Sequence, residues 1–198
     1  MFAYIRGKLV TKSNTYIVMD VQGIGYKIFM SGKAIEELEE AEELTVHTHY
    51  YVREDNISLY GFMTLEELRM FELLLSVSGI GAKSAIAMLS EITPSSFALA
   101  IITNDISKLV KIPGIGNKTA ARIVLELKDK LKTEQTVTES KDEKVLSAMA
   151  EDNKTSEAIS ALQILGYTRK EIEKALEKVD VESLALEEII RKALGVLS

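Results

Sequence analysis

Cysteine is absent from this 198-residue sequence. Disulfide bonds and thiolate zinc sites are therefore excluded, and the composition fits a reducing compartment. No apolar run approaches the roughly 20 residues of a membrane-spanning helix. The opening residues, MFAYIRGKLVTK, contain neither a long apolar core nor a cleavage signature. We therefore expect no signal peptide, no membrane partner and a cytoplasmic location.

Glycine-rich nucleotide-binding motifs are missing as well. A P-loop requires Gly-Lys-Ser/Thr directly after four spacer residues, and no segment of the chain has it. A dinucleotide fingerprint requires a third glycine where this chain has Ser84 or Thr119. We expect no nucleotide site, no cofactor and no ATP hydrolysis by this chain alone.

The charge is distributed unevenly along the chain. The net charge of −6 argues on its face against a nucleic-acid partner. Residues 1–63, however, carry six basic and nine acidic side chains, residues 64–132 carry nine and seven, and residues 133–198 carry nine and fourteen. The middle segment, at net +2, is the only positive one, and any contact with a polyanion is expected there.

The hydrophobic period changes near residue 64. Residues 1–63 contain five or six short runs rich in β-branched and aromatic residues, such as YIVMDV and LTVHTHYYV. These runs predict a small barrel of the oligonucleotide-binding (OB) type. Gly23 and Gly25 lie between two such runs and predict a hairpin turn. A second hairpin is predicted with its tip near Glu54 to Asn56.

Helical patterns follow the barrel. In residues 64–132, Thr64 followed by Glu67 predicts a capping box at the first helix. Residues 133–144 contain a single apolar residue and predict a flexible linker, which is expected to cover residues 133–153. Residues 154–198 predict a bundle of about three short amphipathic helices, with a helix stop at Gly166. The expected fold class is α+β, with a barrel, a helical domain, a linker and a small bundle.

Two near-copies of one motif carry the chemistry of the middle segment. VSGIGAKSA covers residues 77–85, and IPGIGNKTA covers residues 112–120. Each copy predicts a helix, a tight turn and a second helix, with Ile80 and Ile115 pointing inward. Glycines allow positive φ and leave backbone amides uncovered at a helix start, where anions are favoured. The predicted phosphate-binding residues are Gly79, Gly81, Lys83, Ser84, Gly114, Gly116, Lys118 and Thr119.

Each feature of these copies has a second interpretation. Ser84 and Thr119 either cap the helices or donate to a phosphate oxygen. The turns themselves either bind phosphates or only join helices. The recurrence of the glycines together with the lysine favours phosphate binding, and the pattern resembles the helix-hairpin-helix motif, which grips DNA phosphates without reading bases.

Two other functions compete with that of a non-catalytic DNA-binding scaffold. One is a helix-hairpin-helix DNA glycosylase of the endonuclease III type, in which the lysine matching Lys118 is a Schiff-base nucleophile. That class needs an activating aspartate on a later element and often an iron–sulfur cluster. The chain has no cysteine, and Glu126 and Asp129 lie on the predicted helix of Lys118, too far along it to activate that residue. The other competitor is a general duplex-binding adaptor.

Two further groups of residues invite a metal interpretation. Glu54 and Asp55 form either a solvated turn or half of a metal-nuclease site, but no other carboxylate clusters near them in sequence. His47 and His49 lie two apart on one strand and face the same side. With no third ligand in view, a structural role in the sheet is favoured. We expect no metal site and no catalytic residue.

The whole chain resembles the RuvA family, which binds Holliday junctions in the bacterial RuvAB branch-migration complex. The resemblance rests on RGKL, GIGYKI, THYYVREDNISLYGF, both glycine motifs, KIPGIGNKTAARIVLELKDK, the polar linker and ALQILGYTRKEIEKA, all in the same order. It implies a homotetramer, one or two per junction, that holds four-way DNA open and planar. It also implies an acidic pin, matching Glu54 and Asp55, that separates strands at the crossover. Relatives often carry two basic residues where this chain has Asn117 and Lys118, so a DNA contact at Asn117 is left open.

The resemblance also implies partners. The C-terminal bundle, of the UBA-like type, would recruit the hexameric ATPase RuvB, and the RuvC resolvase is a further candidate partner. Leu165 and Tyr167 are predicted as partly exposed contacts for the motor. The implied role is non-catalytic, in recombination, DNA repair and the SOS response, with ATP hydrolysis residing in RuvB.

Overall fold

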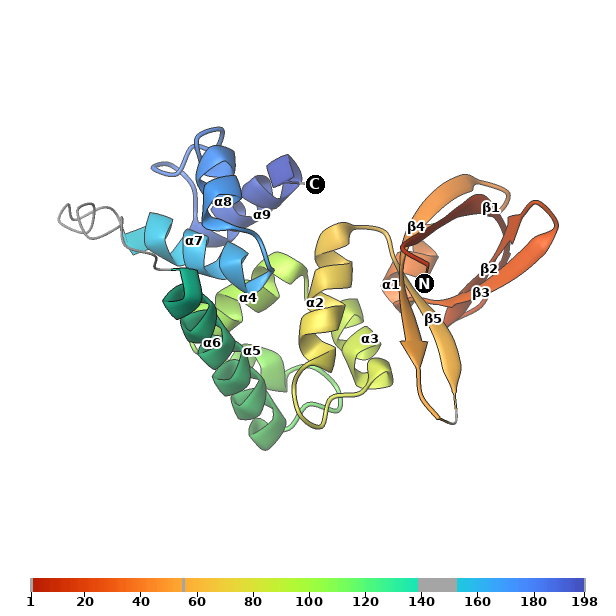
Figure 1. Ribbon diagram of the computed structural model, residues 1–198, viewed down its shortest axis with the longest axis horizontal. Helices are drawn as coiled ribbons and strands as arrows, with labels where there is room; N and C mark the ends of the chain where they lie inside the picture. The colour runs from red at the N-terminus through yellow and green to blue at the C-terminus, as the bar shows by residue number, and fades with distance from the viewer. Residues whose placement is uncertain (1, 55, 139–152, 198) are drawn as a thin grey trace.

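The computed structural model describes residues 2–54, 56–138 and 153–197, and it consists of a small β-barrel beside a larger helical body (Figure 1). Five strands close the barrel in the order β1-β2-β3-β5-β4. All neighbours are antiparallel except β3 and β5, which are parallel and meet at Phe29 and Tyr60. The barrel comprises β1 (Tyr4–Lys12), β2 (Tyr16–Val21), β3 (Ile24–Phe29), the short helix α1 (Gly32–Glu36), β4 (Glu43–Val52) and β5 (Ile57–Phe62).

Apolar side chains fill the barrel, and short turns connect β1 to β2, β2 to β3 and β4 to β5. Ile17 and Met19 alternate on β2 and are both fully buried. The turn between β2 and β3 consists of Gln22 and Gly23, both with positive φ, and the Gly23 amide donates to Asp20 Oδ1 at 2.9 Å. The predicted hairpin at Gly23 is confirmed, as is the mixed α+β fold class with its small barrel.

Five helices form the middle of the chain. Thr64 caps the first of them: its Oγ1 accepts from the Glu67 amide at 3.3 Å, and Glu67 Oε2 accepts from the Thr64 amide at 3.4 Å. The predicted capping box is confirmed. Burial raises the pKa of the Glu67 carboxyl, and its hydrogen bonds to backbone amides oppose that shift. The helices are α2 (Leu65–Leu75), α3 (Ala82–Glu91), α4 (Pro94–Ile102), α5 (Ile106–Val110) and α6 (Asn117–Thr138).

The boundary of the predicted linker is wrong at its start. The linker was expected from residue 133, but α6 continues to Thr138. Extending an existing helix adds one hydrogen bond for each residue fixed, whereas starting a helix is costly, so a helix can run into a polar segment. Residues 139–152 of the predicted linker lie outside the described residues.

Three helices form the C-terminal bundle: α7 (Asn153–Ile164), α8 (Arg169–Leu176) and α9 (Leu186–Leu197). Gly166 follows α7 with φ +83°, and the Tyr167 amide donates back to the Leu162 carbonyl at 3.3 Å. This geometry satisfies a carbonyl at the helix end, and it confirms the predicted helix stop at Gly166.

An aromatic cluster attaches the barrel to the helices. Phe71 on α2 is fully buried, and its ring centroid lies 4.9 Å from that of Phe62 and 5.1 Å from that of Tyr60. His49 on β4 lies edge-on to Phe71 at 5.4 Å, and its Nδ1 lies 2.9 Å from Glu72 Oε1. Packed aromatic side chains of this size fix the orientation of the two parts.

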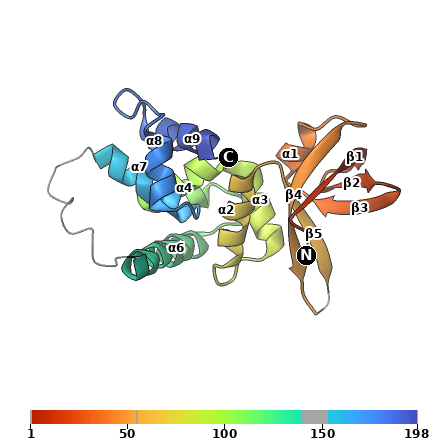
Figure 2. The same cartoon turned by 45° about the horizontal axis from the view of Figure 1, so that its top comes forward.

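The C-terminal bundle packs against the helical body, with α7 and α9 against α4 (Figure 2). Tyr167 Oη donates to Glu66 Oε1 at 2.7 Å, and the Arg69 guanidinium carbon lies 3.9 Å from the centre of the Tyr167 ring. Burial, followed by the bond to Glu66, raises the pKa of the Tyr167 hydroxyl above its usual value. Glu187 on α9 accepts a hydrogen bond from Ser96.

The predicted partial exposure of Leu165 and Tyr167 is wrong. Leu165 is 0% exposed and Tyr167 is 6% exposed. Both belong to one continuous apolar core shared by the helical body and the bundle. Periodicity within a helix identifies its apolar side, but it does not reveal that a second domain covers the remaining surface.

No helix within the described ranges is by itself long and apolar enough to cross a membrane. Only α3 and α4 taken together, bent by 99° at their connection, pass that test of length and composition.

Candidate nucleic-acid interface

The first glycine turn, residues 77–81, joins α2 to α3. Gly79 has φ +85°, a conformation that L side chains rarely adopt. Ile80 is buried, and its amide donates to the Val77 carbonyl at 3.1 Å, so the turn is anchored from the inside. Gly81 is the N-cap of α3, and Lys83 in the first turn of that helix is exposed.

The second glycine turn, residues 112–116, repeats this geometry between α5 and α6. Gly114 has φ +83°, Ile115 is buried, and the Ile115 amide donates to the Ile112 carbonyl at 3.1 Å. Gly116 accepts from the Ala120 amide at 2.9 Å, as Gly81 accepts from Ala85 at 3.0 Å. The inward direction predicted for Ile80 and Ile115 is confirmed.

Both turns present a helix N-terminus and a lysine together. The first amides of a helix have no partner within the helix and carry partial positive charge, so they favour an anion. Lys118 and Asn117 are exposed at the start of α6, and Thr119 is half-buried. Ser84 is exposed on α3, whose N-terminus has no side-chain cap. The capping role considered for Ser84 is therefore wrong, and its hydroxyl faces solvent.

Hydrogen bonds from α6 tie the two turns to each other. The Ser78 amide, in the first turn, donates to Glu126 Oε2 at 3.0 Å. The Ser78 carbonyl accepts from Arg122 Nη1 at 3.3 Å. Arg122 and Glu126 lie one helical turn apart on α6, the helix that begins at the second glycine turn. The two turns therefore form one connected surface.

The β4–β5 hairpin leads into the sequence Glu54–Asp55, which we call the acidic tip. Arg53 and Asn56 close the hairpin through the bond from the Arg53 amide to the Asn56 carbonyl at 2.8 Å. Glu54 is exposed, and Asp55 lies outside the described residues. The predicted hairpin is confirmed.

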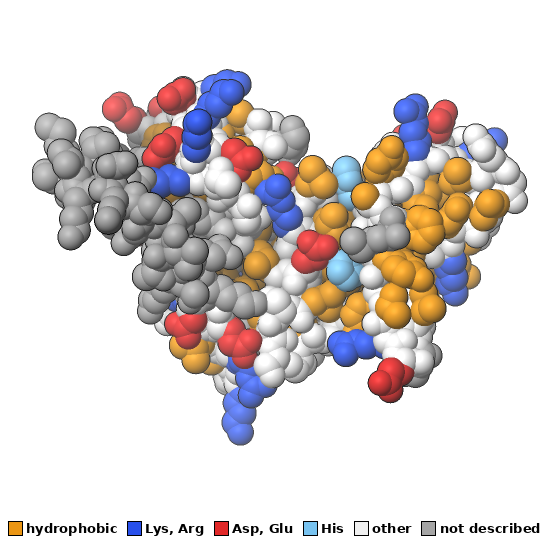
Figure 3. All heavy atoms as spheres, viewed as in Figure 1, with side chains coloured by type: hydrophobic (Ala, Val, Ile, Leu, Met, Phe, Trp, Pro, Cys, Tyr) orange, Lys and Arg blue, Asp and Glu red, His pale blue; other side chains and the backbone are white. Residues whose placement is uncertain are grey.

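The tip and the two glycine turns lie on the same side of the molecule, at the lower edge of Figure 1. Figure 3 shows an acidic side chain at the end of this hairpin and a basic side chain at the lowest point of the helical body. The bundle lies on the other side, away from both. A ligand that spans this side of the molecule would meet both the turns and the tip.

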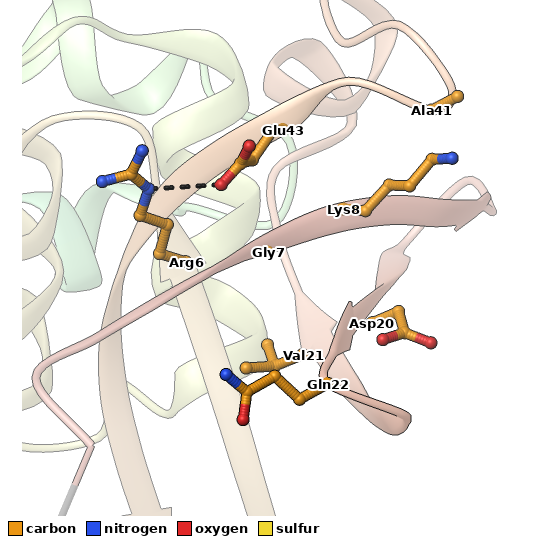
Figure 4. Close-up of a pocket in the computed structure, with 8 residues that line it drawn as sticks. All are labelled: Arg6, Gly7, Lys8, Asp20, Val21, Gln22, Ala41 and Glu43. Carbon is orange, nitrogen blue, oxygen red and sulfur yellow. Dashed lines mark ion pairs between the residues drawn. The ribbon is translucent and has the colours of Figure 1, made fainter.

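Other candidate sites are less developed. Among the described residues, no group of three His, Asp or Glu side chains is placed to hold a metal ion. His49 contacts Glu72 and Phe71, as expected for a structural histidine. A shallow pocket on the barrel is crossed by the Arg6–Glu43 ion pair at 3.5 Å, with Lys8 and Asp20 at its margin (Figure 4). This pocket is charged and open, and it lies on the barrel rather than at the glycine turns. It is therefore not part of the surface that the turns form.

Models of known families match all three parts of the chain. The RuvA N-terminal domain matches residues 1–61, a SAM-like helix-hairpin-helix tandem matches residues 71–129, and the RuvA C-terminal domain matches residues 153–198. The chain belongs to the RuvA family. The resemblance stated from the motifs is thereby confirmed.

Full-length relatives agree with this assignment. A protein of Acetivibrio thermocellus is 50% identical over 202 residues, covering 100% of this chain and 99% of the relative. A protein of Ruminiclostridium cellulolyticum is 44% identical over 203 residues with full coverage of both chains. A protein of Clostridium botulinum is 42% identical over 198 residues, covering 100% of this chain and 99% of the relative. Each of these is named Holliday junction branch migration complex subunit RuvA.

Sequence reasoning located the turns but missed the residues that join them. Ser78 appeared only as the residue before Gly79, and Arg122 was not considered. Glu126 was considered only as a partner for Lys118, whereas its carboxylate is bonded to the Ser78 amide. One available signal was the i, i+4 pairing of a charged donor and a charged acceptor on α6. Another was the difference between Ser78 and Pro113 at equivalent positions of the two copies.

Proposed function

We propose that this RuvA-family chain binds four-way DNA junctions through the backbone phosphates, without reading sequence, and holds them open and planar. The observation that carries the proposal is the shared orientation of three features. Two connected glycine turns and an acidic tip all lie on one side of the molecule. The turns bind phosphate, and the tip repels it. This combination suits DNA whose strands diverge at a crossover better than it suits a continuous duplex.

The turns supply attraction that is independent of sequence. Backbone amides at two helix starts, together with Lys83 and Lys118, can contact phosphates of one DNA arm. Such contacts position a duplex and carry no base information. They also displace condensed counterions, so the affinity falls steeply as salt concentration rises. The net charge of +2 in residues 64–132 favours this surface over the acidic remainder of the chain.

The acidic tip supplies the discrimination. Carboxylates at Glu54 and Asp55 repel any phosphate within about 8–10 Å at physiological salt concentrations. A continuous duplex across this surface would place its backbone close to the tip. At an open crossover the strands diverge, and the tip can occupy the space between them. The tip therefore lowers the affinity for duplex relative to junction and steers the separated strands.

A fourfold assembly matches the four arms. In a cyclic homotetramer each subunit presents the same surface, so every arm meets one pair of turns and the four tips meet at the centre. Val52 and Ile57, which flank the tip, are 56% and 63% exposed, and Leu125 on α6 is 62% exposed. These apolar side chains offer contact area between copies, and one or two tetramers can enclose a junction.

The chain itself is proposed to be non-catalytic. The relatives' name, a branch migration complex subunit, indicates further components, and we propose the ATPase RuvB as the motor and RuvC as a later partner. The bundle faces away from the side that carries the glycine turns and the acidic tip. A motor can therefore reach the bundle while DNA occupies the other side. Tyr167 can contact that motor only if the bundle separates from α2, and the buried Leu165 can do so only after a rearrangement of the helical core. This role belongs to bacterial recombination and repair, and hence to the cytoplasm, where the chromosome lies.

The test is a competition between a synthetic four-way junction and a linear duplex of the same total sequence, without metal or ATP. The junction should bind at least about tenfold more tightly, a difference of roughly 1.4 kcal/mol. Equal affinities would reduce the chain to a general duplex-binding adaptor. Cleavage of abasic DNA with a borohydride-trapped adduct at Lys118 would instead support the glycosylase alternative.

Neutralising the acidic tip should relax this preference. The double variant Glu54→Gln/Asp55→Asn is expected to bind duplex more tightly while its junction affinity changes little, because only the duplex is repelled by the tip. Glu39→Gln/Glu40→Gln is the matched control, since it removes the same charge from exposed positions away from the hairpin. If the tip variant keeps the wild-type ratio of junction affinity to duplex affinity, then Glu54 and Asp55 form an ordinary turn with no role in discrimination.

A further inference from the structure

Ser78, in the first glycine turn, is held by α6 at both its backbone amide and its backbone carbonyl. Glu126 accepts from the amide of Ser78, and Arg122 donates to its carbonyl. Arg122 Nη1 also lies 3.4 Å from the position that a side chain at Gly79 would occupy. Both bonds join a side chain to backbone across more than 40 residues of sequence. They fix the location of the turn itself, whatever side chain stands at residue 78.

Among the described residues, no reciprocal bond of this kind is seen at the second turn. A shift of 35 residues superimposes the two motifs, and it places Pro113 at the position of Ser78 and Glu91 at the position of Glu126. Proline has no backbone N–H, so Pro113 cannot donate to any acceptor. The two motifs therefore differ at this position. Ser78 has a backbone N–H that needs an acceptor outside the turn, whereas Pro113 has none.

We infer that Glu126 is a positioning residue for phosphate binding: its bond to Ser78 holds the first glycine turn at a fixed distance from the second. Arg122 donates to the Ser78 carbonyl, so the side chains of Glu126 and Arg122 together form a bracket around the backbone of Ser78. A rigid spacing lets both turns contact phosphates of one arm at once, without ordering the first turn during binding. This inference rests on the proposed function of the turns, which it extends to a residue that does not itself contact DNA.

The sign of the effect separates this role from a simple surface charge. A carboxylate beside a phosphate-binding surface repels DNA, so its removal should strengthen binding if charge were its only contribution. If instead it positions the turn, removal of its acceptor should weaken binding despite the more favourable charge. Glutamine separates the two effects, because it removes the charge and keeps an acceptor oxygen.

The experiment compares Glu126→Ala, Glu126→Gln and the control Glu91→Ala in the full-length chain, with two readouts. The first is hydrogen exchange of the Ser78 amide without DNA. It should become about tenfold faster in Glu126→Ala and stay near wild type in the other two variants, as expected when one charge-assisted bond is lost. The second is affinity for a four-way junction. Glu126→Ala should bind roughly tenfold more weakly, while Glu126→Gln and Glu91→Ala should bind at least as tightly as the wild type.

Two results would overturn the inference. One is tighter junction binding by both Glu126 variants, which would make Glu126 a surface anion only. The other is unchanged exchange of the Ser78 amide in Glu126→Ala, which would show that no bracket forms in solution. If the wild type binds no DNA at all, the proposed function fails, and amide exchange still decides whether the bracket exists. In a Ser78→Pro background, which removes the donor, Glu126→Ala should cause no further loss of affinity.

Discussion

Replacing Lys83 and Lys118 together with alanine is expected to produce the largest loss of DNA affinity of any pair of exposed residues. Each lysine, if it neutralises one phosphate, contributes about 0.9 to the slope of log affinity against log salt, so the slope should fall by roughly 1.8 for each subunit in contact with DNA. Near 0.1 M salt this corresponds to a loss on the order of a hundredfold for each arm gripped.

The slope also reports how many subunits participate. If four copies act on one junction, the double variant should lower the slope by about 7 in total. The control Lys170→Ala/Lys174→Ala removes the same charge from exposed positions on α8, on the bundle, and should leave the slope within experimental error. Equal effects of the two double variants would mean that binding depends on overall charge and not on the glycine turns.

Phe71→Ala is expected to cause the largest loss of stability. Phe71 is fully buried between the barrel and the helices, where it contacts Tyr60, Phe62 and His49. Removing a buried phenyl ring costs about 3–5 kcal/mol, from lost transfer free energy and the cavity left behind. Because this ring also orients the barrel against α2, the junction preference should weaken in whatever fraction remains folded.

Urea unfolding followed by circular dichroism and by tyrosine fluorescence measures this effect, since the chain has seven tyrosines and no tryptophan. The control is Phe2→Ala, because Phe2 lies on the barrel surface and is 42% exposed. It should cost clearly less than Phe71→Ala. A loss below about 1 kcal/mol at Phe71 would indicate that the barrel and helices are held together by other contacts.

Features that depend on a few neighbouring residues could be predicted from the sequence. The Thr64–Glu67 capping box, the Gly23 hairpin and the Gly166 helix stop each depend on a few neighbouring residues whose backbone chemistry has few solutions. The two glycine turns were recognisable for the same reason, since positive φ at Gly79 and Gly114 is required wherever such a turn occurs. The inward direction of Ile80 and Ile115 follows from the same local geometry.

Contacts between distant segments could not be predicted in this way. Tyr167 is adequately explained as a residue just beyond the end of α7. Nothing near it in sequence indicates that Glu66, 101 residues earlier, accepts a hydrogen bond from its hydroxyl. Glu126 resembles any exposed helical glutamate until the fold places it beside Ser78. Partners of this kind are determined by how the helices pack, and packing is not a property of any short window of residues.

Hydroxyl-radical footprinting of a four-way junction bound by the wild-type chain tests the central claim most directly, because it maps backbone contacts in every arm. The account predicts protection of the backbone in all four arms, close to the crossover, equal between arms of different sequence, and lost in Lys83→Ala/Lys118→Ala. Protection that is confined to one arm, or that extends evenly along the arms without relation to the crossover, would contradict it.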